Sequence, residues 1–206
     1  MTKIILVRHG QTVWNPQGRP RGRAELPLDD VGKVQAKAAA GYIAGRWSLD
    51  AVVASPLRRT MQTAQAIAAQ VDLEVSTHDG LQDIDFGAWE GRLPEDLEAH
   101  WAEAWEMWLT RPQHVVIPGG ETLQAAQRRA MAALREICYN NLDKTVAVVS
   151  HTGIIRLLIL SILDAGLDHF WHIGQDMTAI SELDFDGQVW TVVRLNLAEH
   201  LRDLAG

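Results

Sequence analysis

The fold of this chain is decided by residues 4–10, which read Ile-Ile-Leu-Val-Arg-His-Gly. Four consecutive apolar residues, mostly β-branched, are typical of a strand that is buried on both faces, as in a parallel sheet. Arg8 and His9 follow this strand directly. Because ligands of open α/β sheets bind beyond the carboxyl ends of the strands, we expect both side chains to face a binding site.

Two more short apolar runs end in polar residues. Residues 145–153 (TVAVVSHTG) place His151 behind a second buried strand, and residues 51–54 (AVVA) end at Ser55. The carboxyl ends of parallel strands meet at one edge of a sheet. The sequence therefore predicts that His9 and His151 lie close together, although they are far apart in the chain.

The rest of the chain alternates between helical and extended patterns. Capping residues, apolar periodicity and the turn signal Asp186-Gly187 delimit these elements. Helices are predicted at residues 29–46, from 56, at 121–139 and from 151, and strands at 73–77, 179–185 and 188–195. This order predicts an α/β fold, a three-layer α/β/α sandwich with a mostly parallel sheet that has an antiparallel edge.

The length of 206 residues predicts a single domain that spans residues 1–206. Residues 92–119 break the alternation and are interpreted as a Trp-rich helical insertion. Trp101, Trp105 and Trp108 are spaced so that they share one face of the expected helix. Two interpretations of these tryptophans stay open. They either pack the helix onto the body of the domain or form a lid over the site.

Composition argues against several classes of protein. The formal net charge of −7 disfavours duplex nucleic acid as a partner, because its binding needs a basic face. The longest later apolar stretch, residues 153–163, is interrupted by Arg156 and is too short to span a membrane. Cys138 is the only cysteine, and residues 1–10 lack the pattern of a signal peptide. We therefore expect a cytoplasmic protein that binds neither nucleic acid nor membrane, and a homodimer is left open.

The predicted edge of the sheet also gathers positive charge. Arg8 follows the first strand, and Arg58 lies in the first turn of the helix after Ser55. Guanidinium groups match phosphate oxygens, and the helix that begins near Thr152 adds free backbone N–H groups. The pattern favours an anion pocket on an otherwise acidic protein, although each residue taken alone would also suit a structural role.

At this point the sequence resembles the histidine phosphatase superfamily, in the branch that contains the cofactor-dependent phosphoglycerate mutases. The similarity runs through nearly the whole chain. Its blocks stand in family order at residues 7–15 (VRHGQTVWN), 21–22, 55–64 (SPLRRTMQTA), 86–91 (FGAWEG), 120–122 with Arg129, 150–153 (SHTG), and Asn196 with His200 and Leu201.

The resemblance implies a role for each matching residue. His9 would be the nucleophile that becomes a phosphohistidine, and Arg8, Arg58 and His151 would hold the phosphoryl oxygens. Substrate binding would further involve the residues Asn15, Thr12, Arg21, Gly22 and Thr152. Such cationic and donor side chains stabilise a transferring phosphoryl group by themselves, so neither a metal nor a cofactor is expected.

Two residues depart from the family pattern. Asp83 stands where this branch has a glutamate as general acid, and the aspartate side chain is shorter by about 1.5 Å. Asp83 stays the preferred acid, with Asp85 and Glu90 as alternatives. Thr152 stands where the family usually has glycine, and its side chain should narrow the pocket.

The predicted function is a metal-independent phosphomonoester hydrolase that acts on a small phosphorylated metabolite through a phosphohistidine intermediate. Two alternatives are kept: a cofactor-dependent phosphoglycerate mutase, and a non-catalytic phospho-ligand binding module. In the family that this sequence resembles, the mutases are longer chains whose insertion carries extra basic residues. Here residues 92–119 contain only Arg92 and Arg111 as charged bases. This scarcity disfavours a small anionic carboxylate as substrate and favours a bulky or apolar leaving group.

Overall fold

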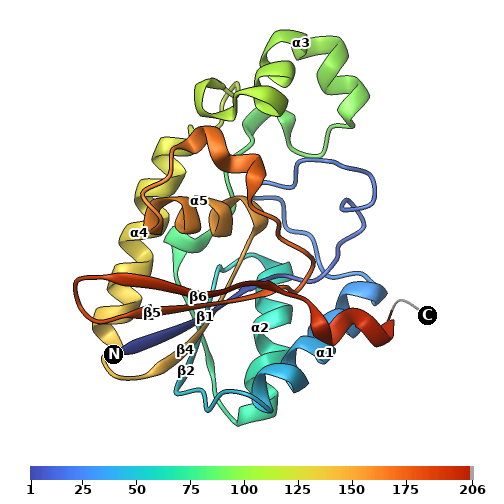
Figure 1. Cartoon of the computed structure of the whole chain (residues 1–206). Helices are drawn as coiled ribbons and strands as arrows, with labels where there is room; N and C mark the ends of the chain where they lie inside the picture. Colours follow the sequence, from blue (N-terminus) through green and yellow to red (C-terminus); the bar gives the residue numbers. More distant parts are fainter. Residues whose placement is uncertain (205–206) are drawn as a thin grey trace.

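A computed structural model describes residues 1–204 and contains one mixed sheet of six strands (Figure 1). Their bounds are β1 Thr2–Arg8, β2 Ala51–Ala54, β3 Val75–Thr77, β4 Thr145–Ser150, β5 Ile180–Phe185 and β6 Trp190–Leu197. The strands lie in the order β3-β2-β4-β1-β5-β6. The first four in this order are parallel, and β5 and β6 pair antiparallel. The predicted mostly parallel sheet with an antiparallel edge is confirmed.

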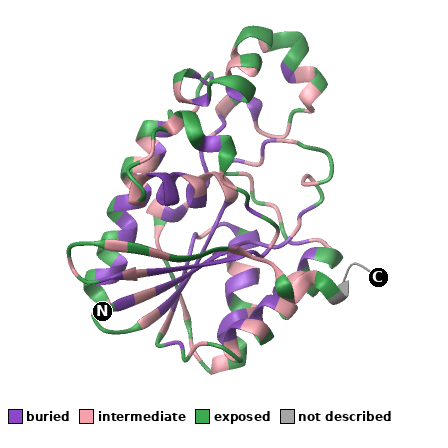
Figure 2. Ribbon diagram, in the orientation of Figure 1, coloured by how far each residue is buried: buried purple, intermediate pink, exposed green. Residues whose placement is uncertain are grey.

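Helices cover both faces of this sheet, as predicted. Their bounds are α1 Asp30–Ala44, α2 Arg58–Val71, α4 Leu123–Asn140 and α5 Thr152–Ile162. Alternate residues of β1 point to opposite faces: Ile5 and Val7 pack with α1 and α2, whereas Ile4 and Leu6 pack with α4 and α5. Figure 2 shows the central strands β1, β2 and β4 as mainly buried. Among the described residues, no helix combines the length and apolar character of a membrane span.

The register of the central strands brings their carboxyl ends level with one another. β1 pairs with β4 so that Arg8 is opposite Ser150, and β4 pairs in turn with β2. The next residues of the three strands are His9, His151 and Ser55. Pairing continues past the end of β1, with 3.0 Å between the backbone nitrogen of His9 and the carbonyl oxygen of Ser150. One edge of the sheet therefore presents both predicted histidines.

The hairpin between β5 and β6 differs in detail from the prediction. The backbone nitrogen of Asp186 lies 3.3 Å from the carbonyl oxygen of Val189 and closes the turn. Gly187 and Gln188 are therefore the central residues, in place of Asp186 and Gly187. Gly187 has a φ of +104°, a conformation that its missing Cβ permits.

Helix α3, Pro94–Thr110, extends beyond the sheet, at the top of Figure 1. Its backbone leaves the helical conformation at Trp101 (φ −140°, ψ 41°), so the three tryptophans do not share one continuous helical face as predicted. Trp108 is buried, and Trp105 contacts Trp89 edge to face, with 5.7 Å between the ring centroids. Packing by these rings holds the second half of α3 against the rest of the protein.

Candidate active site

His9 is fully buried directly after β1, with one ring nitrogen held and the other without a partner. Its Nδ1 lies 2.6 Å from the carbonyl oxygen of Gly10. A carbonyl oxygen can only accept, so Nδ1 carries the ring proton and the free lone pair is on Nε2. Nε2 makes no hydrogen bond within the described residues. The geometry therefore leaves one ring nitrogen of His9 with a lone pair that no residue of the described chain uses.

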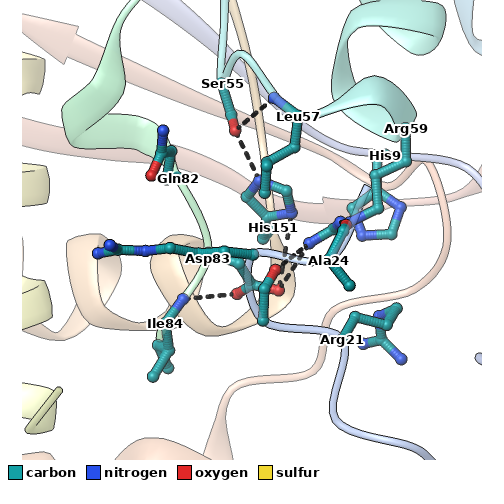
Figure 3. A network of polar contacts seen from close by, with 12 residues as sticks. His9, Arg21, Ala24, Ser55, Leu57, Arg59, Gln82, Asp83, Ile84 and His151 are labelled. Atoms are coloured by element: carbon teal, nitrogen blue, oxygen red, sulfur yellow. Dashed lines mark hydrogen bonds and ion pairs between the residues drawn. The ribbon is translucent and has the colours of Figure 1, made fainter. Parts of the chain in front are cut away.

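His151 lies beside His9, as the strand ends predicted. The two ring centroids are 5.2 Å apart, with the ring planes inclined at 60°. Nε2 of His151 lies 2.8 Å from the hydroxyl oxygen of Ser55 (Figure 3). The same hydroxyl accepts from the backbone nitrogen of Leu57 at 3.5 Å, and α2 begins at Arg58 rather than at residue 56. The three strand ends thus form one connected site.

The predicted placement of Arg58 is wrong, and Arg59 occupies the site instead. The side chain of Arg58 is exposed, whereas Arg59 is fully buried. The Arg59 guanidinium donates to the carbonyl oxygens of Gly22 (2.7 Å) and Ala24 (2.9 Å), and it lies 3.2 Å from Oδ2 of Asp83. Successive residues of a helix diverge by about 100°, so only one of the two arginines can face the histidines. Gly22 contributes through this backbone carbonyl.

Asp83 reaches the centre of the site despite its short side chain. Its Oδ2 lies 3.2 Å from Arg59 and 3.7 Å from Nδ1 of His151 (Figure 3). The alternative acids Asp85 and Glu90 accept hydrogen bonds from backbone N–H groups, and neither contacts one of the histidines. Among these three carboxylates, Asp83 alone contacts a histidine of the site.

The loop that carries Asp83 is fixed by Arg129 from α4. The guanidinium of Arg129 donates to the backbone carbonyl oxygens of Gly80 (2.9 Å), Gln82 (2.7 Å) and Asp83 (2.8 Å). Glu121 accepts from Nε of the same guanidinium at 3.0 Å. The sequence assigned no role to this pair. In the structure it determines where the backbone of the acidic residue lies.

Arg8, Arg21 and Asn15 line a cleft beside the histidines. Oδ1 of Asn15 accepts from both the backbone nitrogen and the hydroxyl of Thr12, each at 2.8 Å. The Asn15 amide nitrogen is consequently turned away from Thr12. Thr12 is buried and orients Asn15, and it does not line the cleft itself.

Burial and positive charge shift the titration of this site. The pKa values of His9 and His151 lie well below the ordinary value, because both rings are buried and because Arg59 is close. Burial likewise lowers the pKa of Arg21, and it lowers that of Arg8 to about 9, where neighbouring guanidinium groups add repulsion. Both histidines are therefore neutral near pH 7, and the arginines favour an anion between them.

Several buried polar atoms of the site have no hydrogen-bond partner within the described residues. They are Nε of Arg8, Nε2 of His9, Nε of Arg21, Nε of Arg59, Nδ1 of His151 and Oγ1 of Thr152. Buried polar groups are nearly always paired, so a cluster of unpaired ones marks the place of a polar ligand. Thr152 is the first residue of α5, whose unpaired backbone N–H groups add further donors.

The sequence predicts that the site needs no metal ion, and this stays a prediction. Within the part of the chain that the structure describes, no three His, Cys, Asp or Glu side chains are grouped so that they could hold a metal ion.

Comparisons with known proteins cover the whole of this site. A family model described as histidine phosphatase superfamily (branch 1) matches residues 4–198. The chain is 36% identical over 201 residues to phosphoserine phosphatase 1 of Hydrogenobacter thermophilus, covering 98% of this chain and 95% of that protein. The solved phosphoserine phosphatase of Entamoeba histolytica, in complex with 3-phosphoglyceric acid, matches at 31% identity with a TM-score of 0.87. That match covers 98% of this chain and 100% of the other. YhfR of Bacillus stearothermophilus shares the fold at 24% identity, with a TM-score of 0.94 and coverage of 98% and 100%.

Proposed function

The chain belongs to branch 1 of the histidine phosphatase superfamily, and from this premise we propose that it hydrolyses small phosphorylated metabolites through a phosphohistidine on His9. The observation that supports this most directly is the free Nε2 of His9, buried among unpaired donors. An imidazole lone pair held beside guanidinium groups suits attack on a phosphoryl group, whose transfer depends on positioning and on charge stabilisation.

In the first step, Nε2 of His9 forms a bond to phosphorus while the bond between phosphorus and the ester oxygen breaks. Arg8, Arg59 and His151 donate to the phosphoryl oxygens and stabilise their charge. Arg59 thereby takes the role that the resemblance had implied for Arg58. Asp83 gives a proton to the departing oxygen, so that an alcohol leaves.

In the second step, water attacks the phosphorus and the bond to His9 breaks. Asp83 takes a proton from the attacking water, which restores the acid for the next cycle. Inorganic phosphate leaves, and His9 returns to its neutral form. Asn15 lines one of the two adjoining clefts, Thr152 lines the other and Arg21 lines both, and all three are proposed to bind substrate.

The positions of two arginines near α3 help to distinguish a hydrolase from a mutase. Arg92 and Arg111 are exposed, and neither lines the clefts beside the histidines. This placement supports the hydrolase. The mutase and the non-catalytic binding module become alternative outcomes of the test below.

Other expectations stay predictions. These are the single domain of residues 1–206 with its helical insertion at about 92–119, the cytoplasmic location and a homodimer. Cys138 is buried, and burial raises the pKa of its thiol to about 12, which suits an inert structural residue.

Hydrolysis of p-nitrophenyl phosphate by the purified protein tests the proposal. Turnover is expected to persist after exhaustive treatment with EDTA, because the proposed charge stabilisation comes from arginine and histidine. Vanadate should inhibit, since it mimics five-coordinate phosphorus. Loss of activity that magnesium restores would contradict metal independence. Failure to release phosphate from any of a panel of phosphomonoesters would favour the binding module, and isomerisation of phosphoglycerate would favour the mutase.

The neighbouring arginines provide a matched pair of variants. Arg59→Gln is expected to lower kcat/KM by roughly 10²- to 10³-fold, because it removes a buried donor of charge to the transition state. Arg58→Gln should leave the rate within about twofold, because that side chain is exposed. Steady-state kinetics on p-nitrophenyl phosphate, with melting curves to verify folding, measures both. A larger loss at Arg58 than at Arg59 would refute this part of the proposed site.

A further inference from the structure

Two residues near the end of the described chain, Asn196 and His200, have no part in the mechanism proposed above. Asn196 lies in β6, and His200 lies in a short 3-10 helix, η5, Glu199–Leu204. Tyr42 of α1 holds this helix, because its hydroxyl donates to Oε2 of Glu199 at 2.7 Å and its ring centroid lies 5.4 Å from that of His200. The helix is therefore docked beside α1 (Figure 1).

Residues 175–179, called here the 175–179 segment, lie directly against the ends of Arg8 and His9. Nη1 of Arg8 donates to the carbonyl oxygen of Gln175. The backbone nitrogen of Thr178 lies 3.5 Å from the carbonyl oxygen of His9. The segment thus touches both the proposed nucleophile and the arginine beside it.

The contact with Gln175 determines how Arg8 presents its charge. Arg8 is buried and lines the cleft beside the histidines, and its Nε has no partner within the described residues. A guanidinium group is planar, so holding one of its nitrogens fixes the direction of the remaining donors. The position of the Gln175 carbonyl oxygen therefore aims the free donors of Arg8.

Asn196 and His200 together form what we call the C-terminal clamp, because both bind the 175–179 segment through their side chains. Oδ1 of Asn196 accepts from the backbone nitrogen of Asp176 at 2.8 Å, and its Nδ2 donates to Oδ2 of Asp176 at 2.9 Å. Nε2 of His200 lies 3.0 Å from Oγ1 of Thr178. The residue next to Gln175 and the residue that touches His9 are both anchored in this way.

The backbone of the segment is strained at one of these anchored residues. Thr178 is fully buried and has a φ of +48°, a conformation that is rare for a β-branched residue. Strained residues persist only where their surroundings hold them, and they gather at functional sites. Without the contact to His200, we expect Thr178 to relax and the segment to shift relative to Arg8.

We propose that Asn196 and His200 are positioning residues for hydrolysis, which hold the 175–179 segment so that the Gln175 carbonyl aims Arg8 at the phosphoryl group. This inference rests on the proposed function, since it assigns Arg8 to the phosphoryl oxygens. Neither residue of the clamp touches the substrate, and their effect passes through Arg8. Misplacing a catalytic group by about 1 Å can slow a reaction by about 10²-fold.

The first test compares two substitutions of His200. His200→Ala removes the contact with Thr178 and should lower kcat/KM for p-nitrophenyl phosphate by about 10- to 100-fold. His200→Gln should restore most of the rate, because its amide can hydrogen-bond the same hydroxyl. Arg202→Gln, at an exposed position of the same helix, is the control and should stay within about twofold.

Asn196→Gly keeps the proposal falsifiable if His200→Ala does not fold. Asn196 has a φ of +52°, which glycine adopts without strain, so this substitution removes only the two contacts with Asp176. It should produce a loss of similar size. Melting curves of all variants monitor folding.

A double-mutant cycle separates positioning of Arg8 from general support of the fold. Once Arg8→Gln has removed the guanidinium, nothing remains for the clamp to aim, so adding His200→Ala should lower kcat/KM by less than about twofold further. Calorimetry with inorganic phosphate repeats the cycle without turnover. His200→Ala should weaken phosphate binding by about tenfold in the wild-type background and by less than about twofold in the Arg8→Gln background.

Three results would overturn the clamp: equal losses from His200→Ala with and without Arg8, no rescue by His200→Gln, or unchanged kinetics and phosphate affinity in both His200→Ala and Asn196→Gly. The proposed function is scored separately. If the wild-type protein hydrolyses no phosphomonoester, that function fails, and the calorimetric cycle still decides whether the clamp positions Arg8 for a phosphate group.

Discussion

Replacement of His9 by alanine is expected to lower turnover by roughly 10⁴- to 10⁶-fold, the range seen when a covalent nucleophile is removed. The reason is that Nε2 of His9 is the free lone pair at the centre of the site. Rapid quenching of the wild-type protein with radiolabelled substrate should trap a phosphoprotein that is labile in acid and stable in base. The alanine variant should trap none.

Loss of activity in this variant must be separated from loss of the fold. His114→Ala, at an exposed position outside both clefts, should retain full activity and the same labelling. Melting curves of both variants monitor folding. Label found on a serine, or labelling that survives in His9→Ala, would refute the phosphohistidine.

Replacement of Asp83 by asparagine should have the second largest effect, and the effect should depend on the substrate. Alkyl phosphates have poor leaving groups that need a proton, so their hydrolysis should slow by about 10²- to 10⁴-fold. p-Nitrophenyl phosphate releases a stable anion and should slow far less. Measuring kcat/KM for both substrates gives the contrast. An equal loss on both would mean that Asp83 supports Arg59 or its own loop and is not the acid.

Two further substitutions sharpen this test. Asp83→Glu restores the residue type that the resemblance implies, yet the aspartate already lies 3.2 Å from Arg59 and 3.7 Å from Nδ1 of His151. An added methylene would crowd these contacts, so we expect a lower rate for Asp83→Glu. Asp85→Asn should retain the contrast between substrates, because Asp85 contacts neither histidine. A selective loss on alkyl phosphates in Asp85→Asn would transfer the role of acid to that residue.

The parts of the site that depend on the strands were predictable from sequence. The apolar runs before His9 and His151 define buried strands, and parallel pairing brings their ends together whatever lies between. The structure accordingly places the two rings 5.2 Å apart. The position of Asp83 came only from the resemblance, with Asp85 and Glu90 as alternatives, and in the structure its Oδ2 lies 3.7 Å from Nδ1 of His151.

The choice between Arg58 and Arg59 could not be made from periodicity alone. It depends on which side of α2 faces the histidines, and in the structure that side carries Arg59, whose guanidinium contacts Gly22, Ala24 and Asp83. These contacts join segments that are distant in the chain.

The strand order has a consequence for how the chain reaches its native state. Lys3 in β1 pairs with Thr145 on one side and with Asp184 on the other, so both neighbours of the first strand come from segments much later in the sequence. Contacts between such remote segments are slow to form, because a long loop must close before they stabilise anything. During synthesis, His9 leaves the ribosome early, but the sheet around it cannot form until β4 and β5 have also been synthesised. Enzymatic activity should therefore be the last native property to appear, and a nascent chain that ends before residue 180 should have helices but no activity.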